Sequence, residues 1–201
     1  MGTHSSRSTR DRILDAAAHV MLTEGFAATT TKGIAREADL SEGTLYKHFT
    51  DKSELFLAVL MERLPAAESF MSALADTASP PREWLVSVGR AAIAFYTGAF
   101  PMSASVFSDP GLLAAHRTAL AKLDAGPHRP LVALMQSLRA RQQRGEVGAD
   151  VDCAAAATLL LGACFQSAFL DSFEQRSTDP AGAQARSEAL VDTLILGLGL
   201  A

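Results

Sequence analysis

Hydroxyl, carboxylate, phenol, imidazole and ammonium side chains follow one another closely between residues 30 and 52. A helix that enters a DNA major groove needs short or polar side chains at its N-terminal end, and donors on neighbouring elements must hold it against phosphate. The spacing of these residue types predicts both features. The residues meant are Thr30, Thr31, Glu42, Gly43, Thr44, Tyr46, His48 and Lys52.

Phosphate contacts are expected at both ends of the stretch. The hydroxyls of Thr30 and Thr31, with the free N–H groups of the helix that begins there, suit a phosphate oxygen. The side chains of Tyr46 and His48 are amphipathic, so their rings can pack against the protein while their polar ends reach DNA backbone oxygens. Lys52 stands at the start of a further helix, where its charge adds to the positive helix end.

Base contacts are expected from the start of the second helix. Glu42 can accept a hydrogen bond from a cytosine amino group, and Thr44 can touch a thymine methyl. Gly43 costs about 1 kcal/mol in a helix relative to alanine, and a close approach to DNA explains that cost. The alternative is a small helical turn with no ligand.

The elements that must position these groups are short helices. Apolar spacing predicts a helix over residues 9–24, ended by Gly25 in a left-handed conformation. Thr30 caps a helix to about residue 38, and Asp39, which tolerates a left-handed conformation, turns the chain. Ser41 caps a helix through residue 48, and Thr50 or Asp51 caps the next.

Arginines precede these elements. Arg7, Arg10 and Arg12 lie on or before the first turn of the first helix. They are either solvated charges or an arm along the DNA backbone.

The remaining chain predicts further helices and no strand. Pro65 kinks or interrupts the helix that contains it. A long apolar connection is expected over residues 100–110, and a loop over residues 177–182. Helices are expected near 82–99, 111–123, 130–145, 152–175 and 184–200. The fold class is all-α, with about nine helices.

Bulk properties set limits on the function. Of 201 residues, 48% are hydrophobic and 20% charged, which allows a sizeable core and argues against disorder. The net charge is −4, and residues 1–55 hold seven Lys or Arg against eight Asp or Glu, so DNA binding must rest on placement rather than on bulk charge. The N-terminus lacks a signal peptide, and the apolar run over residues 153–165 is short for a bilayer and suits a buried helix. We expect a soluble, cytoplasmic protein with no membrane partner.

No catalytic or metal-binding pattern accompanies the stretch. The sequence lacks a P-loop, a dinucleotide glycine fingerprint, paired Glu-x-x-His motifs and a Cys-His cluster. Cys153 and Cys164 lie about 16 Å apart along one predicted helix and cannot bridge. We expect no enzyme activity, no metal and no cofactor.

The motif Ile34-Ala35-x-x-Ala38-x-Leu40-Ser41-x-Gly43-Thr44-Leu45-Tyr46-x-His48-Phe49-x-x-Lys52-x-x-Leu55 resembles the DNA-binding signature of TetR/AcrR-type transcriptional regulators. The resemblance covers roughly residues 10–57. It implies a three-helix helix-turn-helix domain over residues 1–55 and a helical ligand-binding and dimerisation bundle over residues 56–201. It also implies a homodimer on a palindromic operator, usually a repressor that a small molecule releases.

The resemblance assigns roles by position. Backbone contacts fall to Thr30, Thr31, Tyr46, His48 and Lys52, and base-facing roles to Glu42, Gly43, Thr44 and Lys47. Two positions depart from the family: Asp39 stands where glycine is usual in the turn, and Gly33 where an acid is frequent. Because Gly33 removes a capping box, that helix is expected to be softer.

The C-terminal part resembles the family in layout only. The last two long helices are expected to pair with those of a second copy in a dimer. For each candidate interface residue, the alternative is packing inside the core of one monomer. The interface candidates are Leu159, Leu170, Phe173, Leu190, Leu194 and Leu198. A second set of residues is expected to line a pocket for an apolar ligand that carries one or two polar groups. The alternative is that these residues belong to the hydrophobic core and bind no ligand. These residues are Trp84, Phe95, Tyr96, Phe100, Met102, Phe107, His116, Met135, Phe165, Gln166 and Phe169.

Three functions therefore stay open. The first is a ligand-responsive repressor. The second is an all-α enzyme or small-molecule carrier that does not bind DNA. The third is a DNA-binding scaffold with no effector.

Overall fold

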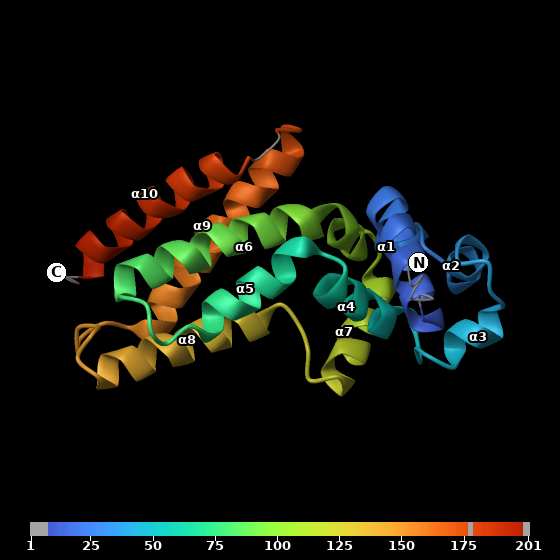
Figure 1. Cartoon of the computed structure of the whole chain (residues 1–201), viewed down its shortest axis with the longest axis horizontal. Helices are drawn as coiled ribbons and strands as arrows, with labels where there is room; N and C mark the ends of the chain where they lie inside the picture. Colours follow the sequence, from blue (N-terminus) through green and yellow to red (C-terminus); the bar gives the residue numbers. More distant parts are fainter. Residues whose placement is uncertain (1–7, 177–178, 199–201) are drawn as a thin grey trace, which may run out of the picture. The chain divides into compact units, whose positions relative to one another are not determined.

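The computed structural model describes residues 8–176 and 179–198, with side chains as far as residue 196 in the last helix. Its regular structure in these ranges is entirely helical, which confirms the predicted all-α class (Figure 1). The α-helices are α1 (Thr9–Ala28), α2 (Thr31–Glu37), α3 (Glu42–Tyr46), α4 (Lys52–Glu62), α5 (Pro65–Ala75), α6 (Pro81–Ser103), α7 (Pro110–Lys122), α8 (His128–Gln143), α9 (Cys153–Phe173) and α10 (Pro180–Leu198). One 3-10 helix, η1 (Ala104–Ser108), follows α6.

These helices form two compact units. The first contains the chain up to Leu64 together with Pro101–Ala125, and the second contains Pro65–Phe100 and the chain from Gly126 onward. The predicted division at residue 55 between a DNA-binding and a ligand-binding domain stays a prediction, because the two compact units do not show what either part of the chain binds.

In the first unit, α1 breaks at Gly25, where the sequence predicts its end, and helical turns then resume as far as Ala28. Gly25 takes φ 78°, and a Cβ there would lie 2.9 Å from the Ser105 hydroxyl oxygen, so only glycine fits without a shift. Phe26, the next residue, is buried. The hydroxyl of Thr29 then donates to the Gly25 carbonyl at 2.7 Å, which fixes the exit of the helix.

The segment over residues 100–110 is not the long connection expected. The helix α6 continues to Ser103 with Pro101 inside it, and η1 packs against α1 and α7. Met102 and Val106 are buried there, which explains the apolar composition. The stretch forms helical turns because its apolar side chains pack on the core of the first unit. The prolines at its two ends led to the prediction of an irregular connection, which is wrong.

Two other boundaries also differ. Pro65 interrupts the preceding helix as expected, but it also begins α5, because proline suits the first turn of a helix. The last helix begins at Pro180, inside the expected loop, for the same reason.

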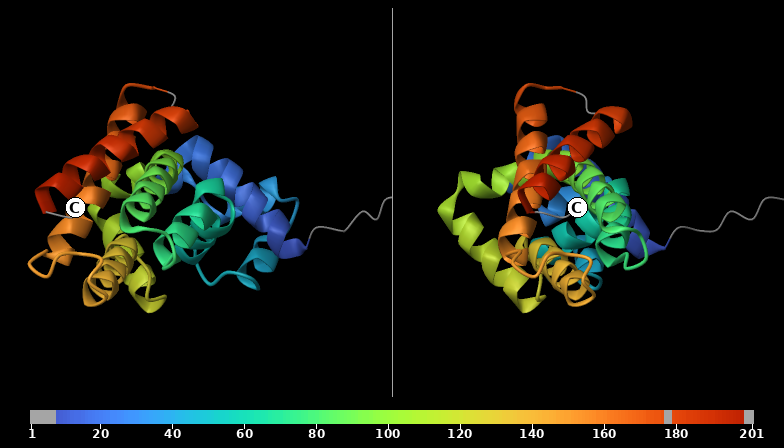
Figure 2. Two further views of the ribbon diagram at one scale, coloured as in Figure 1. Left: turned by 60° about the vertical axis from the view of Figure 1, so that its left-hand side comes forward. Right: turned by 90° about the vertical axis from the view of Figure 1, so that its left-hand side faces the viewer.

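The second unit packs α5, α6, α8, α9 and α10 around one core. Trp84 is fully buried, and its ring N–H donates to the Ala73 carbonyl at 2.9 Å. Beside it, Gly89 allows close approach of α6 and α10, since a Cβ there would lie 2.4 Å from the Ser187 oxygen. Ser187 donates to the Val86 carbonyl at 2.8 Å. The chain turns back after α9, and α10 packs against it, as Figure 1 and Figure 2 show.

Helix α9 is only partly the buried helix that the sequence predicts. Leu159, Phe165 and Phe173 are exposed on it. Two segments, Pro81–Ser108 and Cys153–Phe173, are long and apolar enough to cross a membrane by length and composition, and 50% and 39% of their respective windows are buried within the protein. A soluble core helix passes the same test, so this finding is weak support for a membrane span.

Candidate nucleic-acid interface

The two short helices of the site are held at their starts by the predicted caps. The Thr30 hydroxyl oxygen accepts from the Gly33 N–H at 2.9 Å, and the Ser41 oxygen accepts from the Thr44 N–H at 3.1 Å. Asp39 takes φ 52° in the turn between them, the left-handed conformation expected of it. Figure 1 shows α2 and α3 joined by this turn.

The inner face of α3 is anchored in the core. Leu45 of α3 and Phe49, which follows the helix, are buried, as are Ile34 and Ala35 of α2. The opposite face leaves four of the candidate DNA-contacting residues open to solvent. They are Gly43, Tyr46, Lys47 and His48.

Thr44 is less free than its neighbours. Its hydroxyl lies 2.8 Å from the Ser41 oxygen and is half-buried. This contact fixes the side-chain rotamer, which leaves the methyl group as the part suited to a thymine contact.

A second cluster joins α2 to α3. The Thr31 hydroxyl donates to a carboxylate oxygen of Glu42 at 2.5 Å, and the Tyr46 hydroxyl lies 3.3 Å from the Thr31 oxygen. Sequence reasoning placed each of these residues at the interface but missed that they bond to one another.

The ammonium of Lys52 faces the connection between α1 and α2. It donates to the carbonyl oxygens of Phe26 at 2.9 Å and Thr29 at 2.8 Å, and it lies 4.3 Å from the centre of the Phe26 ring. Burial lowers the pKa of Lys52. The residue therefore holds the entry to α2, and its third N–H proton stays available for a phosphate.

We expect Lys52→Met to weaken binding to all duplexes about equally and to reduce the salt slope by about one unit. It should also lower the free energy of unfolding by about 1 kcal/mol, because two carbonyls lose a charged donor. Titrations at several salt concentrations and thermal melts measure the two effects. Lys32→Met removes an exposed lysine from α2 and should leave the melting midpoint unchanged. An unaltered salt slope in Lys52→Met would leave the lysine a purely structural role.

The arginines near the N-terminus contact the protein itself. Arg10 pairs with Glu62 at 2.6 Å, and Arg12 donates to the carbonyls of Ala38 at 2.8 Å and Asp39 at 3.2 Å. Arg12 thus clamps the turn before α3, a role that no local sequence pattern signals across 26 residues. Arg7 lies outside the described residues.

His116 of α7 belongs to the same unit and is buried. Its Nδ1 lies 3.0 Å from the Ser53 hydroxyl oxygen, and its ring packs on Phe26 and Phe56 at 4.9 Å and 5.0 Å between centroids. The charged groups near it are Asp51 and Lys52. Burial lowers the pKa of His116.

Because the folded pKa of His116 lies below its unfolded value, the unfolded chain binds the proton more readily. Its stabilising contribution is therefore complete above the ordinary histidine pKa and is lost as the pH falls below it. We expect the melting midpoint to fall more between about pH 7.5 and about pH 5.5 in the wild type than in His116→Gln. His128→Gln removes an exposed histidine and should retain the wild-type slope. Equal slopes in wild type and His116→Gln would contradict this account.

The expected ligand-pocket residues divide between the two units. Met102, Phe107 and His116 lie in the first, where Phe107 is exposed. The others lie in the second, where Trp84 is core, Met135 packs on the core and Gln166 is exposed.

Five of the second unit's candidates form a chain of ring contacts. The centroid distances are 5.6 Å for Phe95–Tyr96, 5.6 Å for Tyr96–Phe165, 6.3 Å for Phe165–Phe100 and 5.7 Å for Phe100–Phe169. Burial raises the pKa of Tyr96 to about 12, so its hydroxyl is neutral at physiological pH and able to donate.

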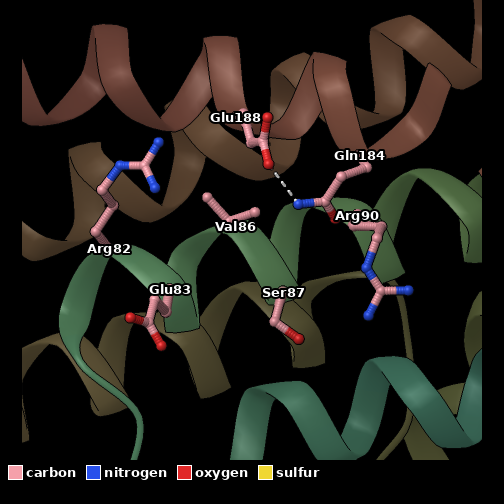
Figure 3. Close-up of a pocket in the computed structure, with 7 residues that line it drawn as sticks. All are labelled: Arg82, Glu83, Val86, Ser87, Arg90, Gln184 and Glu188. Atoms are coloured by element: carbon pink, nitrogen blue, oxygen red, sulfur yellow. Dashed lines mark hydrogen bonds between the residues drawn. The ribbon is translucent and has the colours of Figure 1, made fainter. Parts of the chain in front are cut away.

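A hollow of about 280 Å³ lies elsewhere in the second unit, between α6 and α10. Its lining is Arg82, Glu83, Val86, Ser87, Arg90, Gln184 and Glu188. Arg82 pairs with Asp192 and the Gln184 amide donates to Glu188 at 2.7 Å. Figure 3 shows the charged ends of Arg82, Glu83 and Arg90 pointing in different directions. The groups do not converge on one ligand, and none was among the expected pocket residues.

The expected interface residues have different surroundings. Leu159, Leu170 and Phe173 are exposed on α9, whereas Leu190 and Leu194 are half-buried against the core. The side chain of Leu198 lies outside the described residues. Phe165 and Phe169 share the exposed side of α9, and Leu196 of α10 is 84% exposed, which the sequence did not predict.

The arrangement of α2, turn and α3 defines a helix-turn-helix protein. Residues 13–59 match the family of bacterial regulatory proteins named after TetR. The uncharacterized HTH-type transcriptional regulator YvkB of Bacillus subtilis (strain 168) is 45% identical over 56 residues, 28% of this chain and 30% of that relative. Over residues 13–59 the chain therefore resembles the DNA-binding part of the TetR family.

Two solved structures extend the likeness to the whole fold. GusR of Salmonella enterica is 28% identical with a TM-score of 0.66, covering 98% of this chain and 97% of that one. FadR from Bacillus subtilis, in complex with stearoyl-CoA, is 21% identical with a TM-score of 0.66, covering 93% and 98%. By contrast, the aligned segments span 27% to 43% of the length of the first curated relatives.

Proposed function

We propose that the protein is a homodimeric transcriptional repressor that a small apolar ligand releases from a palindromic DNA operator. The observation that carries the proposal is the first turn of α3. It is capped by Ser41, anchored by Leu45 and exposed at Gly43, so it fits a major groove while α2 faces the backbone. A cytoplasmic location follows from access to DNA.

Charge does not carry this proposal. The net charge of −4 gives no general attraction to DNA, so binding must come from placed donors. The donors proposed for the backbone are Thr30, Thr31, Tyr46, His48 and Lys52. Base contacts are proposed for Gly43, Thr44 and Lys47; the sequence also predicts one for Glu42.

The exposed side of α9 supports the homodimer. Phe165, Phe169 and Phe173 recur at four-residue spacing with Leu170 beside them. Leu159 lies about three helical turns before Leu170, on the same side, and all five side chains are exposed to water. A contiguous apolar face of this kind marks an interaction surface. A second copy of the chain covers it by symmetry, and paired helix-turn-helix units suit a palindrome.

The ring contacts of the second unit support an apolar effector. Phe95, Tyr96, Phe100 and Phe165 form a connected series of ring contacts, and the Tyr96 hydroxyl adds a single neutral donor to this apolar cluster. Such a combination suits a ligand that is mostly hydrocarbon with one polar group. Nothing in the contacts favours an enzyme or a carrier that does not bind DNA.

Selection from random-sequence duplex DNA tests the function. The wild type should enrich an inverted repeat, and Thr44→Ala should enrich a repeat altered at thymine positions, because the methyl contact is lost. Recovery of unrelated sequences only would contradict operator binding. A screen for apolar compounds that release the enriched duplex then tests the effector.

A further inference from the structure

Glu42 has an environment that does not fit the base-reading role its position suggests. It is the first residue of α3 and half-buried, and its carboxylate accepts the Thr31 hydroxyl proton at 2.5 Å. Thr31 is itself the first residue of α2. The bond therefore joins the two helices of the helix-turn-helix at the ends that face DNA in the proposed function.

The direction of the hydrogen bonds follows from the donors present. An ionised carboxylate can only accept, so Thr31 is the donor to Glu42. The Thr31 hydroxyl has one proton, which leaves its oxygen to accept from Tyr46 across 3.3 Å. The Tyr46 proton thus points to the Thr31 oxygen, and the Thr31 proton points to the Glu42 carboxylate, so neither is directed to solvent.

A phosphate oxygen and a carboxylate oxygen make the same demand on a hydroxyl. Both are anionic acceptors of short, charge-assisted hydrogen bonds. Thr31 cannot donate to Glu42 and to phosphate at once, and Tyr46 can donate to phosphate only after leaving Thr31. A phosphate contact from the Thr31 hydroxyl must therefore break its bond to Glu42, and one from Tyr46 must break its contact with Thr31.

We infer that Glu42 is an internal phosphate mimic, which sets the overall DNA affinity by competing for the Thr31 and Tyr46 hydroxyls rather than by reading a base. The inference rests on the proposed DNA binding. In the free protein the carboxylate fixes α3 against α2. In the complex the phosphate replaces the carboxylate on the same hydroxyls, so affinity is lowered for every sequence alike.

Glu42→Ala tests the inference on the duplex enriched by selection and on a scrambled duplex of equal length. Binding to both should become about tenfold tighter, because no internal anion competes for the hydroxyls. Glu42→Gln retains a neutral acceptor and should fall between wild type and Glu42→Ala. Glu37→Ala is the matched control: it removes an exposed acid from the end of α2 and so reports the general effect of one negative charge.

Thr31→Val separates the mimic from simple repulsion between Glu42 and DNA. In a Thr31→Val background the gain from Glu42→Ala should shrink to that of Glu37→Ala, since the contested proton is gone. In the absence of DNA, amide hydrogen exchange in α3 should be faster in Glu42→Ala and in Thr31→Val than in wild type. It should be unchanged in Glu37→Ala.

The contrary results are distinct. Weaker binding by Glu42→Ala confined to duplexes with particular cytosines would restore the base-reading role and overturn the inference. An unchanged affinity, or a gain that persists in the Thr31→Val background, would overturn it too. If the wild type binds no duplex at all, the proposed function fails and the inference fails with it.

Discussion

Phe173→Asp is expected to convert the proposed homodimer to a monomer and to weaken binding to the proposed operator by about two orders of magnitude. Phe173 is 75% exposed at the end of α9, and its ring stacks on Phe169 at 6.1 Å. An aspartate there would be desolvated against apolar side chains of a second copy, with no partner for its charge. Two helix-turn-helix units that separate lose the advantage of binding one palindrome together.

The matched control for Phe173→Asp is Phe107→Asp. Phe107 is 74% exposed and lies on η1, in the other compact unit. The same charge on an equally exposed phenylalanine should leave the oligomeric state unchanged. Sedimentation of both variants and duplex titrations measure the difference. A Phe173→Asp protein that remains dimeric would place the dimer interface elsewhere.

Arg141→Ala is expected to lower the free energy of unfolding by about 3 kcal/mol. The side chain is 2% exposed, and its guanidinium lies 4.3 Å from the centre of the Trp84 ring. It donates to the Ser79 carbonyl at 3.0 Å, to a Glu146 carboxylate oxygen at 2.8 Å and to the Asp76 carbonyl at 3.3 Å. Truncation removes this donor from the Ser79 and Asp76 carbonyls, leaves Glu146 with Arg144 as its remaining partner, and opens space beside the ring.

The neighbouring Arg144 provides the control for Arg141. It pairs with the same Glu146, but its side chain is 43% exposed, so Arg144→Ala should lower the free energy of unfolding far less than Arg141→Ala. Denaturant unfolding followed by fluorescence reports both, because Trp84 is the chain's single tryptophan. Equal losses in the free energy of unfolding would contradict the claim that the buried contacts of Arg141 stabilise the fold.

Local chemistry made the helix-turn-helix predictable. Thr30, Ser41 and either Thr50 or Asp51 are predicted to cap helices, and Thr30, Ser41 and Asp51 accept the N–H groups that a cap should. Asp39 was expected in a left-handed conformation and adopts it. These features depend on residues within three or four positions of one another, so the sequence alone determines them.

Contacts between distant residues were not predictable. The Arg12 clamp on the turn and the His116–Ser53 bond join residues 26 and 63 positions apart. The Thr31–Glu42 bond spans 11 positions and depends on the angle between two helices. No periodicity encodes these distances, and each changed the role assigned to a residue.

The exposed side of α9 illustrates a different limit. An apolar run predicts a helix covered on several sides, yet sequence pattern does not say whether the cover belongs to the same chain. Leu159 and Phe173 are apolar and exposed, whereas Leu190 and Leu194, expected with them, pack on the core. Only the packing in the folded protein distinguishes the exposed residues from those in contact with the core.

The most direct test of the account is equilibrium binding of the selected inverted-repeat duplex and of a scrambled duplex at about 0.15 M salt. We predict two protomers per inverted repeat and a preference of more than about a hundredfold over the scrambled sequence. Equal affinity for the two duplexes, or no binding to either, would contradict the account.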